Sequence, residues 1–255
     1  VCEVAGLSVV DVSDPGNPAV VGGYDTPTVA SGVAVEGNHV FVTDQSSGLI
    51  VLDVTDPANP VLVGTCPISG NALDVAISGA YAYLAAGSAG LRVVDISSPS
   101  IPFVAGSCSL GGNSLGVAVA GDNVFIAAET AGLRVVDITD PTNPVPVGAC
   151  VPPVRACGVT VAGDCAYVAD ADLGLQVVDI MSPTSPFLKG GCTTAGTARA
   201  VATAGAYAYV AADSSGLQIV DITDTASPSV LTGFNTPGCV YGVVSVGEHV
   251  YLADN

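Results

Sequence analysis

Residues 90–95 read Gly-Leu-Arg-Val-Val-Asp, and this stretch returns, with small changes, six times along the chain at a fixed interval of 42 residues. The glycine that opens each copy lies at Gly6, Gly48, Gly90, Gly132, Gly174 and Gly216. No residue is inserted between copies, so the repeats account for nearly all of the 255 residues. The sequence therefore predicts a single domain over residues 1–255, built from six copies of one unit.

Each complete copy contains four short segments rich in Val, Ile, Ala and Tyr, as expected for strands buried on both faces of a sheet. In one copy they are Asp74–Ser78, Tyr81–Ala85, Gly90–Ile96 and Phe103–Ser107, which we name strands a, b, c and d. A glycine between a and b indicates a tight hairpin with positive φ. Between c and d, Asp-Pro and Asn-Pro pairs indicate turns in which an aspartate bonds the backbone. A repeat of about 40 to 45 residues with this alternation is typical of a β-propeller blade.

The two ends of the chain supply half a repeat each. Residues 6–24 contain only strands c and d, and residues 242–252 contain only strands a and b. We therefore expect an all-β, six-bladed β-propeller with four-stranded blades. The N-terminal strands c and d pair with the C-terminal strands a and b, which hides the strand edges and closes the ring.

The repeat also resembles a known family. The segments Leu91-Arg-Val-Val-Asp-Ile96 and Leu133-Arg-Val-Val-Asp-Ile138 are similar to the LVIVD repeat of bacterial and archaeal secreted or surface β-propellers, and the similarity extends to every copy. The resemblance implies an extracellular interaction module, and it implies no particular reaction, because a fold hosts many activities.

The net charge of the chain limits the classes of partner that it can bind. The formal net charge is −18, with 23 acidic residues against five Lys and Arg, so phosphate-rich partners are repelled and we expect no nucleic acid binding. Gly and Pro interrupt every apolar stretch before it reaches about 18 residues, so we expect no transmembrane segment.

The eight cysteines fall into two groups. The periodic cysteines end strand d in four copies, where neighbours in a ring stand roughly 20 Å apart, too far for a disulfide among themselves; they are Cys66, Cys108, Cys150 and Cys192. We interpret them mainly as small apolar side chains, with crosslinking to another chain or to an unidentified group as the alternative. Cys2 and Cys239 flank the shared blade on one face, and we expect them to form a disulfide that staples the ring outside a reducing compartment. Cys150 and Cys157 are a weaker candidate pair.

Candidate ligand residues lie mainly in the b–c loops. Six acidic residues gather there and could form a cation-binding rim, or simply a solvated acidic face, with Ca²⁺ as the only cofactor considered; they are Asp44, Glu129, Asp170, Asp172, Asp213 and Asp254. The two histidines, His39 and His249, share one repeat position on adjacent blades. A metal site that uses both of them is a less favoured hypothesis. The repeat aspartates, such as Asp95, are expected to be structural.

No catalytic residues stand out, because the sequence holds no arrangement of nucleophile, base and acid and every connection is short. We therefore expect a non-enzymatic, secreted or cell-surface module that binds a protein or assembles with itself, for example as a subunit of a surface assembly or filament. One alternative is a carbohydrate- or cation-binding propeller that uses the acidic b–c loop face. A metal-dependent hydrolase or lactonase is the least favoured hypothesis.

Overall fold

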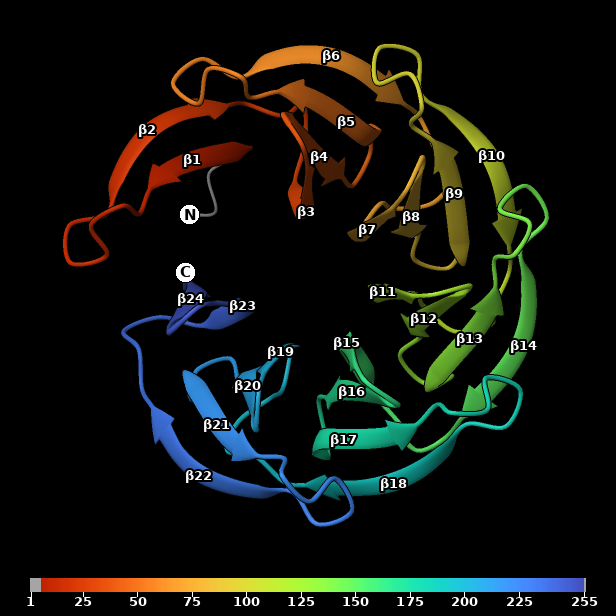
Figure 1. Ribbon diagram of the computed structural model, residues 1–255, viewed down its shortest axis with the longest axis vertical. Coiled ribbons are helices and arrows are strands. Elements are labelled where there is room, and N and C mark those ends of the chain that lie inside the picture. The colour runs from red at the N-terminus through yellow and green to blue at the C-terminus, as the bar shows by residue number, and fades with distance from the viewer. Residues whose placement is uncertain (1–5, 255) are drawn as a thin grey trace. The chain divides into compact units, whose positions relative to one another are not determined.

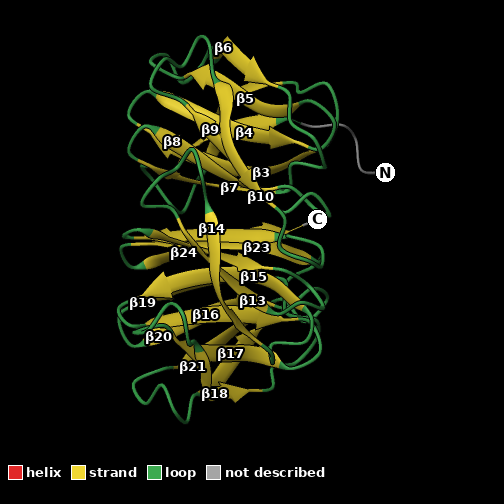
Figure 2. Cartoon of the chain, turned by 90° about the vertical axis from the view of Figure 1, so that its right-hand side faces the viewer, coloured by secondary structure: helices red, strands yellow, loops and turns green. Residues whose placement is uncertain are grey.

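The protein is described by a computed structural model over residues 6–254, in which all 24 regular elements are β-strands (Figure 2). Strands consecutive in sequence pair antiparallel within each sheet. The predicted strands a to d of one copy appear at Asp74–Ser78, Tyr81–Ala85, Leu91–Asp95 and Phe103–Cys108. The all-β prediction and these strand positions, within one residue, are confirmed.

The first compact unit runs to Ser109 and includes the turn Asp140–Pro144. It holds a two-stranded sheet of β1 (Leu7–Asp11) and β2 (Ala19–Tyr24) and two four-stranded sheets. One consists of β3 (Ala30–Glu36), β4 (His39–Asp44), β5 (Gly48–Asp53) and β6 (Val61–Cys66), and the other of β7 (Asp74–Ser78), β8 (Tyr81–Ala85), β9 (Leu91–Asp95) and β10 (Phe103–Cys108). Strand β3 lies beside β7 (Figure 1).

The second compact unit contains Leu110–Thr139 and the chain from Val145 onward. Its four-stranded sheets are β11 (Gly116–Ala120), β12 (Asn123–Ala127), β13 (Leu133–Asp137) and β14 (Val145–Cys150); β15 (Ala156–Ala162), β16 (Cys165–Asp170), β17 (Gly174–Asp179) and β18 (Phe187–Cys192); and β19 (Ala200–Ala204), β20 (Tyr207–Ala211), β21 (Leu217–Asp221) and β22 (Ser229–Phe234). Strands β23 (Val240–Val246) and β24 (His249–Asp254) form a two-stranded sheet. Strand β15 lies beside β11 and β19, and β23 lies beside β19.

The turns are fixed locally, as the sequence predicts. All six a–b glycines have positive φ, between 55° and 58°, a conformation that costs glycine nothing. The repeat aspartate accepts a hydrogen bond from the backbone N–H two residues later in all six copies, at 2.7–3.1 Å; the aspartates are Asp11, Asp53, Asp95, Asp137, Asp179 and Asp221. The structural role predicted for them is confirmed.

The core lies between the faces of successive sheets. Between β3–β6 and β7–β10, the earlier sheet contributes Phe41 and Val51, and the later sheet contributes Val75 and Leu84. The second unit repeats this division between its own sheets. Because side chains alternate along a strand, every sheet has one face for the preceding repeat and one for the following repeat.

In the first unit, the face toward the preceding repeat is only half covered. Leu7 of β1 and Tyr24 of β2 pack against the cluster that contains Val40 and Leu52. Strand β3, in contrast, exposes Val33 by 57% and Val35 by 62%. Val75, which occupies the repeat position of Val33 one copy later, is only 6% exposed.

In the second unit, the face of β23 that would meet a following repeat is open. Val244 and Val246 are exposed by 52% and 60% and lie on the face of the strand opposite to Val243. Val243 has the same repeat position as Val33, so the two units leave opposite faces of their repeats uncovered.

A glycine in the outer strand couples each repeat to the next. A Cβ atom built on Gly64 of β6 would lie 2.3 Å from the carbonyl oxygen of Pro99, so only glycine lets that turn pack so closely. The same close approach to the following turn occurs at Gly22, Gly106, Gly148 and Gly190. The sixth outer strand, β22, carries Thr232 at this position.

Candidate functional site

Two of the six acidic residues expected to form a rim on the b–c loops, Asp44 and Asp170, are buried. The Asp44 carboxylate accepts hydrogen bonds from the backbone N–H groups of Thr28 and Ser47, at 2.7 and 2.8 Å. Asp170 accepts bonds from four backbone N–H groups in the same way, at 2.6–2.9 Å. These two aspartates are not solvated, because their oxygens cap the d–a connection and the b–c loop of their own repeat; cation binding by the six residues stays a prediction.

Replacing Asp44 with Asn is expected to lower the free energy of unfolding by about 2 kcal/mol at pH 7. Burial raises the pKa of this carboxyl, but the hydrogen bonds from Thr28 and Ser47 outweigh it and hold the pKa at about 2, below its ordinary value of 3.8. A depressed pKa stabilises the fold above pH 4, and the contribution is lost as the pH falls toward 2. The difference between wild type and Asp44→Asn, measured by urea unfolding, should therefore vanish near pH 2.

The matched control is Asp172→Asn, because Asp172 is half exposed and pairs only with Arg155 at 2.8 Å. An exposed ion pair contributes less than about 1 kcal/mol. Equal losses for the two variants at pH 7 would contradict the capping role of Asp44.

The other members of the expected rim also have partners within their own repeats or in the next. Asp213 accepts two hydrogen bonds from Arg199, at 2.8 and 3.2 Å. These bonds are the main reason why the pKa of the Asp213 carboxyl is lowered. Glu129 has a φ of 47°, and its backbone N–H donates to Ala156 in the next repeat. Asp254 is exposed and accepts weak bonds from the d–a connection before it. Across residues 6–254, no three His, Cys, Asp or Glu side chains lie close enough to hold a metal ion.

The histidines occupy the predicted repeat position. His39 of β4 lies opposite Asp53 of β5, and His249 of β24 lies beside Tyr251, with 6.3 Å between ring centroids. They belong to different compact units, so their use in one metal site stays a prediction.

The periodic cysteines lie at the ends of β6, β10, β14 and β18 as free thiols. Cys66 and Cys150 belong to the apolar clusters between successive sheets. Burial raises the pKa of the Cys108 thiol to about 11, and it also raises the pKa of the other three. Thiols with raised pKa values are poor nucleophiles, which favours the packing interpretation.

The remaining cysteines do not form the candidate pairs within the described part of the chain. Cys150 and Cys157 are both free, and their sulfur atoms face backbone oxygens of Pro152 and Arg155. Cys239 is a free thiol whose pKa is raised, mainly by its hydrogen bond to Asp213. Cys2 lies outside the described residues, so its pairing with Cys239 stays a prediction.

The outer strands expose a row of apolar side chains. Strand d opens with exposed apolar side chains in copy after copy, and we name this set the apolar rim; its large members are Val20, Val61, Leu62, Phe103, Val104, Val145, Phe187, Leu188, Val230 and Leu231. Each outer strand pairs on one side with strand c, and its other edge has no strand partner among residues 6–254. Monomeric proteins seldom expose repeated apolar side chains along free strand edges, because such edges associate.

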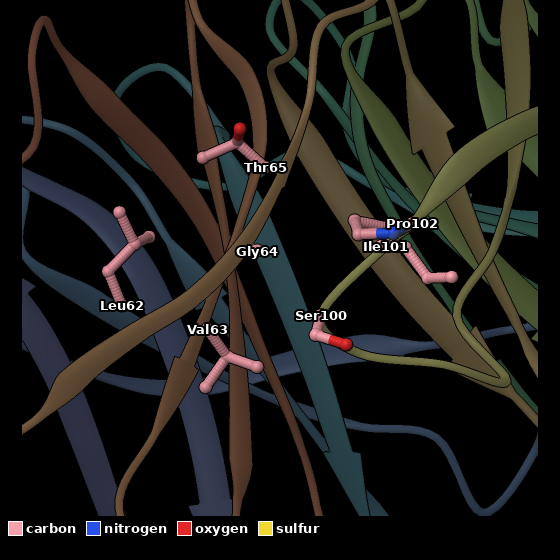
Figure 3. A pocket seen from close by; sticks show the side chains of 7 residues that line it. All are labelled: Leu62, Val63, Gly64, Thr65, Ser100, Ile101 and Pro102. Carbon is pink, nitrogen blue, oxygen red and sulfur yellow. The ribbon is translucent and has the colours of Figure 1, made fainter.

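Part of the apolar rim is hollowed into a groove of about 520 Å³. Residues Leu62, Val63, Gly64 and Thr65 of β6 form one wall, and Ser100, Ile101 and Pro102 of the following turn form the other (Figure 3). The close approach allowed by Gly64 brings the two walls together. All of these residues belong to the first unit.

Comparison with known proteins agrees with this repeat architecture. The profile of the LVIVD repeat matches residues 1–26, 28–67, 69–109, 111–151, 155–194 and 195–236. The chain belongs to the LVIVD repeat family. The resemblance inferred from the sequence is thereby confirmed over six copies, and no curated protein matched the chain.

Solved structures resemble this LVIVD repeat protein in fold at low sequence identity. A functionally unknown protein from Desulfotomaculum acetoxidans DSM 771 is 15% identical, with a TM-score of 0.73 over 86% of this chain and 74% of that one. The computationally designed Ika8 protein is 12% identical, with a TM-score of 0.69 over 92% and 71%. BamB from Moraxella catarrhalis is 14% identical, with a TM-score of 0.63 over 92% and 83%. These similarities support a propeller-like arrangement of sheets and carry no function.

Sequence reasoning missed the most unusual residue of the groove. Ile101 is 72% exposed, yet the same turn position holds Asn or Ser in the five other copies, namely Asn17, Asn59, Asn143, Ser185 and Ser227. Aligning the six c–d turns would have revealed this apolar exception.

Among the residues described, no helix is long and apolar enough to span a membrane.

Proposed function

We propose that this LVIVD repeat protein is a non-enzymatic interaction module, secreted or at the cell surface, that binds protein or assembles through its apolar rim. The observation that carries the proposal is the return of exposed Val, Leu and Phe side chains at the start of the outer strands. Buried apolar area drives most protein association, and a row of similar sites favours partners that bind several of them at once. The net charge of −18 favours a protein partner over nucleic acid.

We further propose that the ring closes when β24 pairs with β1. The ladder between β4 and β5 pairs His39 with Asp53, and the equivalent ladder between the chain ends would pair His249 with Asp11. The exposed Val244 of β23 would then cover Val33 of β3, just as successive repeats cover each other inside each unit. Two uncovered faces with complementary repeat positions support this closure.

A carbohydrate-binding function on the b–c loop face is the second candidate. Arg199 lies over the ring of Tyr241, 5.9 Å from its centroid, and also bonds Asp213. An exposed aromatic ring beside a fixed pair of charges is a surface on which a sugar ring can stack. The buried state of Asp44 and Asp170 leaves cations fewer ligands on this face.

Oxidation of Met181 tests the proposed function, because it is the only methionine of the chain and lies 72% exposed in the turn that leads from β17 to the outer strand β18. Hydroxyl radicals applied to intact producing cells, or to the secreted assembly, are expected to oxidise Met181 several-fold more slowly than in the purified protein. Mass spectrometry of the peptide measures the ratio.

Tyr207 serves as the internal control, since it is 41% exposed but opens an inner strand away from the apolar rim. Its rate of modification should be the same in both states. Equal rates for Met181 in both states would count against an apolar rim that is covered in the native setting.

A further inference from the structure

The free edge of β6 is one of four outer edges, with those of β2, β10 and β22, that contain neither a proline nor a basic residue. A strand edge presents unpaired backbone N–H and C=O groups to which an extended peptide can add. Strand β14 contains Pro146, which has no N–H, and Lys189 places a cation in the small pocket beside β18. Strand β6 contains neither residue, and its edge has no partner within residues 6–254.

The turn beside β6 supplies a specific apolar contact. Its Ile101 replaces the Asn or Ser of the other turns, and in two of those turns the Asn amide donates to the turn aspartate at 2.8–2.9 Å. Ile101 gives up such a bond and nevertheless remains 72% exposed, across the groove from Leu62, which is 45% exposed. Ile101 lies next to the exposed apolar rim and lines the groove, so its side chain is available for a contact outside the chain.

The charges around the groove indicate the chemistry of the partner. Asp53 ends β5 opposite Val61, the first residue of β6, and Asp56 lies in the turn before β6; each carboxylate accepts a backbone hydrogen bond in this turn. No Lys or Arg lines the groove, and the whole chain has only five. A bound segment with Lys or Arg at its ends would therefore be attracted, whereas a second, equally acidic copy of this chain would be repelled.

We propose that β6 and the turn around Ile101 bind an extended, apolar peptide segment with basic flanks, by adding it as a strand to the β6 edge. Alternate side chains of the segment lie between Leu62 and Ile101, and one of its basic ends lies near Asp53 and Asp56. The inference rests on the proposed interaction function and names the class of partner for one site on the apolar rim.

The test uses the fluorescein-labelled peptide Lys-Lys-Val-Thr-Val-Thr-Val-Lys-Lys and fluorescence polarisation with the intact protein. Leu62→Lys and Ile101→Asn are each expected to weaken binding by about tenfold, the range of a central contact residue. Ile101→Asn restores the residue of the other turns, so the fold should be retained. Hydrogen exchange of the amides in Val61–Cys66, followed by NMR, should slow when the peptide is bound.

The matched control is Leu188→Lys, at the repeat position of Leu62 but beside Lys189, and it should leave the affinity within about twofold. Three results would overturn the inference: no binding of the peptide, equal losses in the Leu62 and Leu188 variants, or equal binding of a peptide with Glu in place of Lys. A dimer of the protein that is disrupted by Leu62→Lys would also overturn it, in favour of a second copy. If Met181 is protected on native cells while the peptide fails, the proposed function stands and only this inference falls.

Discussion

Deleting residues 1–24 is expected to abolish cooperative unfolding and to cause aggregation. The deletion removes β1 and β2, so Val40, Ile50 and Leu52 lose the cover that Leu7 and Tyr24 provide. Each of these two contacts is worth about 1 to 3 kcal/mol of apolar burial, and the deletion also leaves β24 without a partner if the ring closes as proposed. Light scattering and thermal unfolding followed by circular dichroism measure both effects.

A deletion of residues 1–5 alone is the control, because it keeps β1 and β2 intact; both deletions are compared under reducing conditions, so that the predicted Cys2–Cys239 disulfide plays no part. It should unfold cooperatively and remain monodisperse. A soluble 25–255 fragment with an unchanged melting temperature would show that the first two strands contribute nothing to the fold.

Val33→Asp is expected to reduce the free energy of unfolding by about 3 kcal/mol or more, because closure would bury the new carboxylate without a partner. For a chain of this length, the loss corresponds to a fall in melting temperature of about 6–12 °C. A substitution on a surface that stays exposed costs about 0.5 kcal/mol or less. Calorimetry of the purified variant therefore distinguishes a covered β3 face from an open one.

Val61→Asp provides the comparison, since Val61 is 60% exposed, slightly more than Val33, and also lies in a strand. Its position opposite Asp53 adds some repulsion, so it overstates the cost at an exposed site. Losses of the same size in the two variants would speak against closure of the ring by β23 and β24.

The sequence predicts the strands because the signals that form them are local. The a–b glycines and the turn aspartates act within a few residues, so their six-fold recurrence is sufficient to place the hairpins. The arrangement of the outer strand is less local: the approach of Pro99 to Gly64 joins residues of two repeats, and the spacing alone does not reveal it.

The candidate site was harder to predict, because burial decides what a polar or apolar residue does. Asp44 and Asp254 share one register, yet Asp44 is buried under its neighbours and Asp254 is exposed at the end of β24. A list of loop acids cannot separate these two environments. Ile101 is the reverse case, since it is apolar and the structure nevertheless leaves it in solvent.

Thr232 marks the junction between repeats that should separate first when the protein unfolds. Five junctions share the same glycine coupling, in which a Cβ would meet the backbone of the following turn, and the sixth outer strand presents a branched side chain instead. In a ring closed as we propose, the turn around Gly16 cannot approach β22 as the other turns approach their glycines. Under tension or heat, strands should therefore separate first at the junction between β22 and the blade that the two chain ends share. The five glycine-coupled junctions should open afterwards.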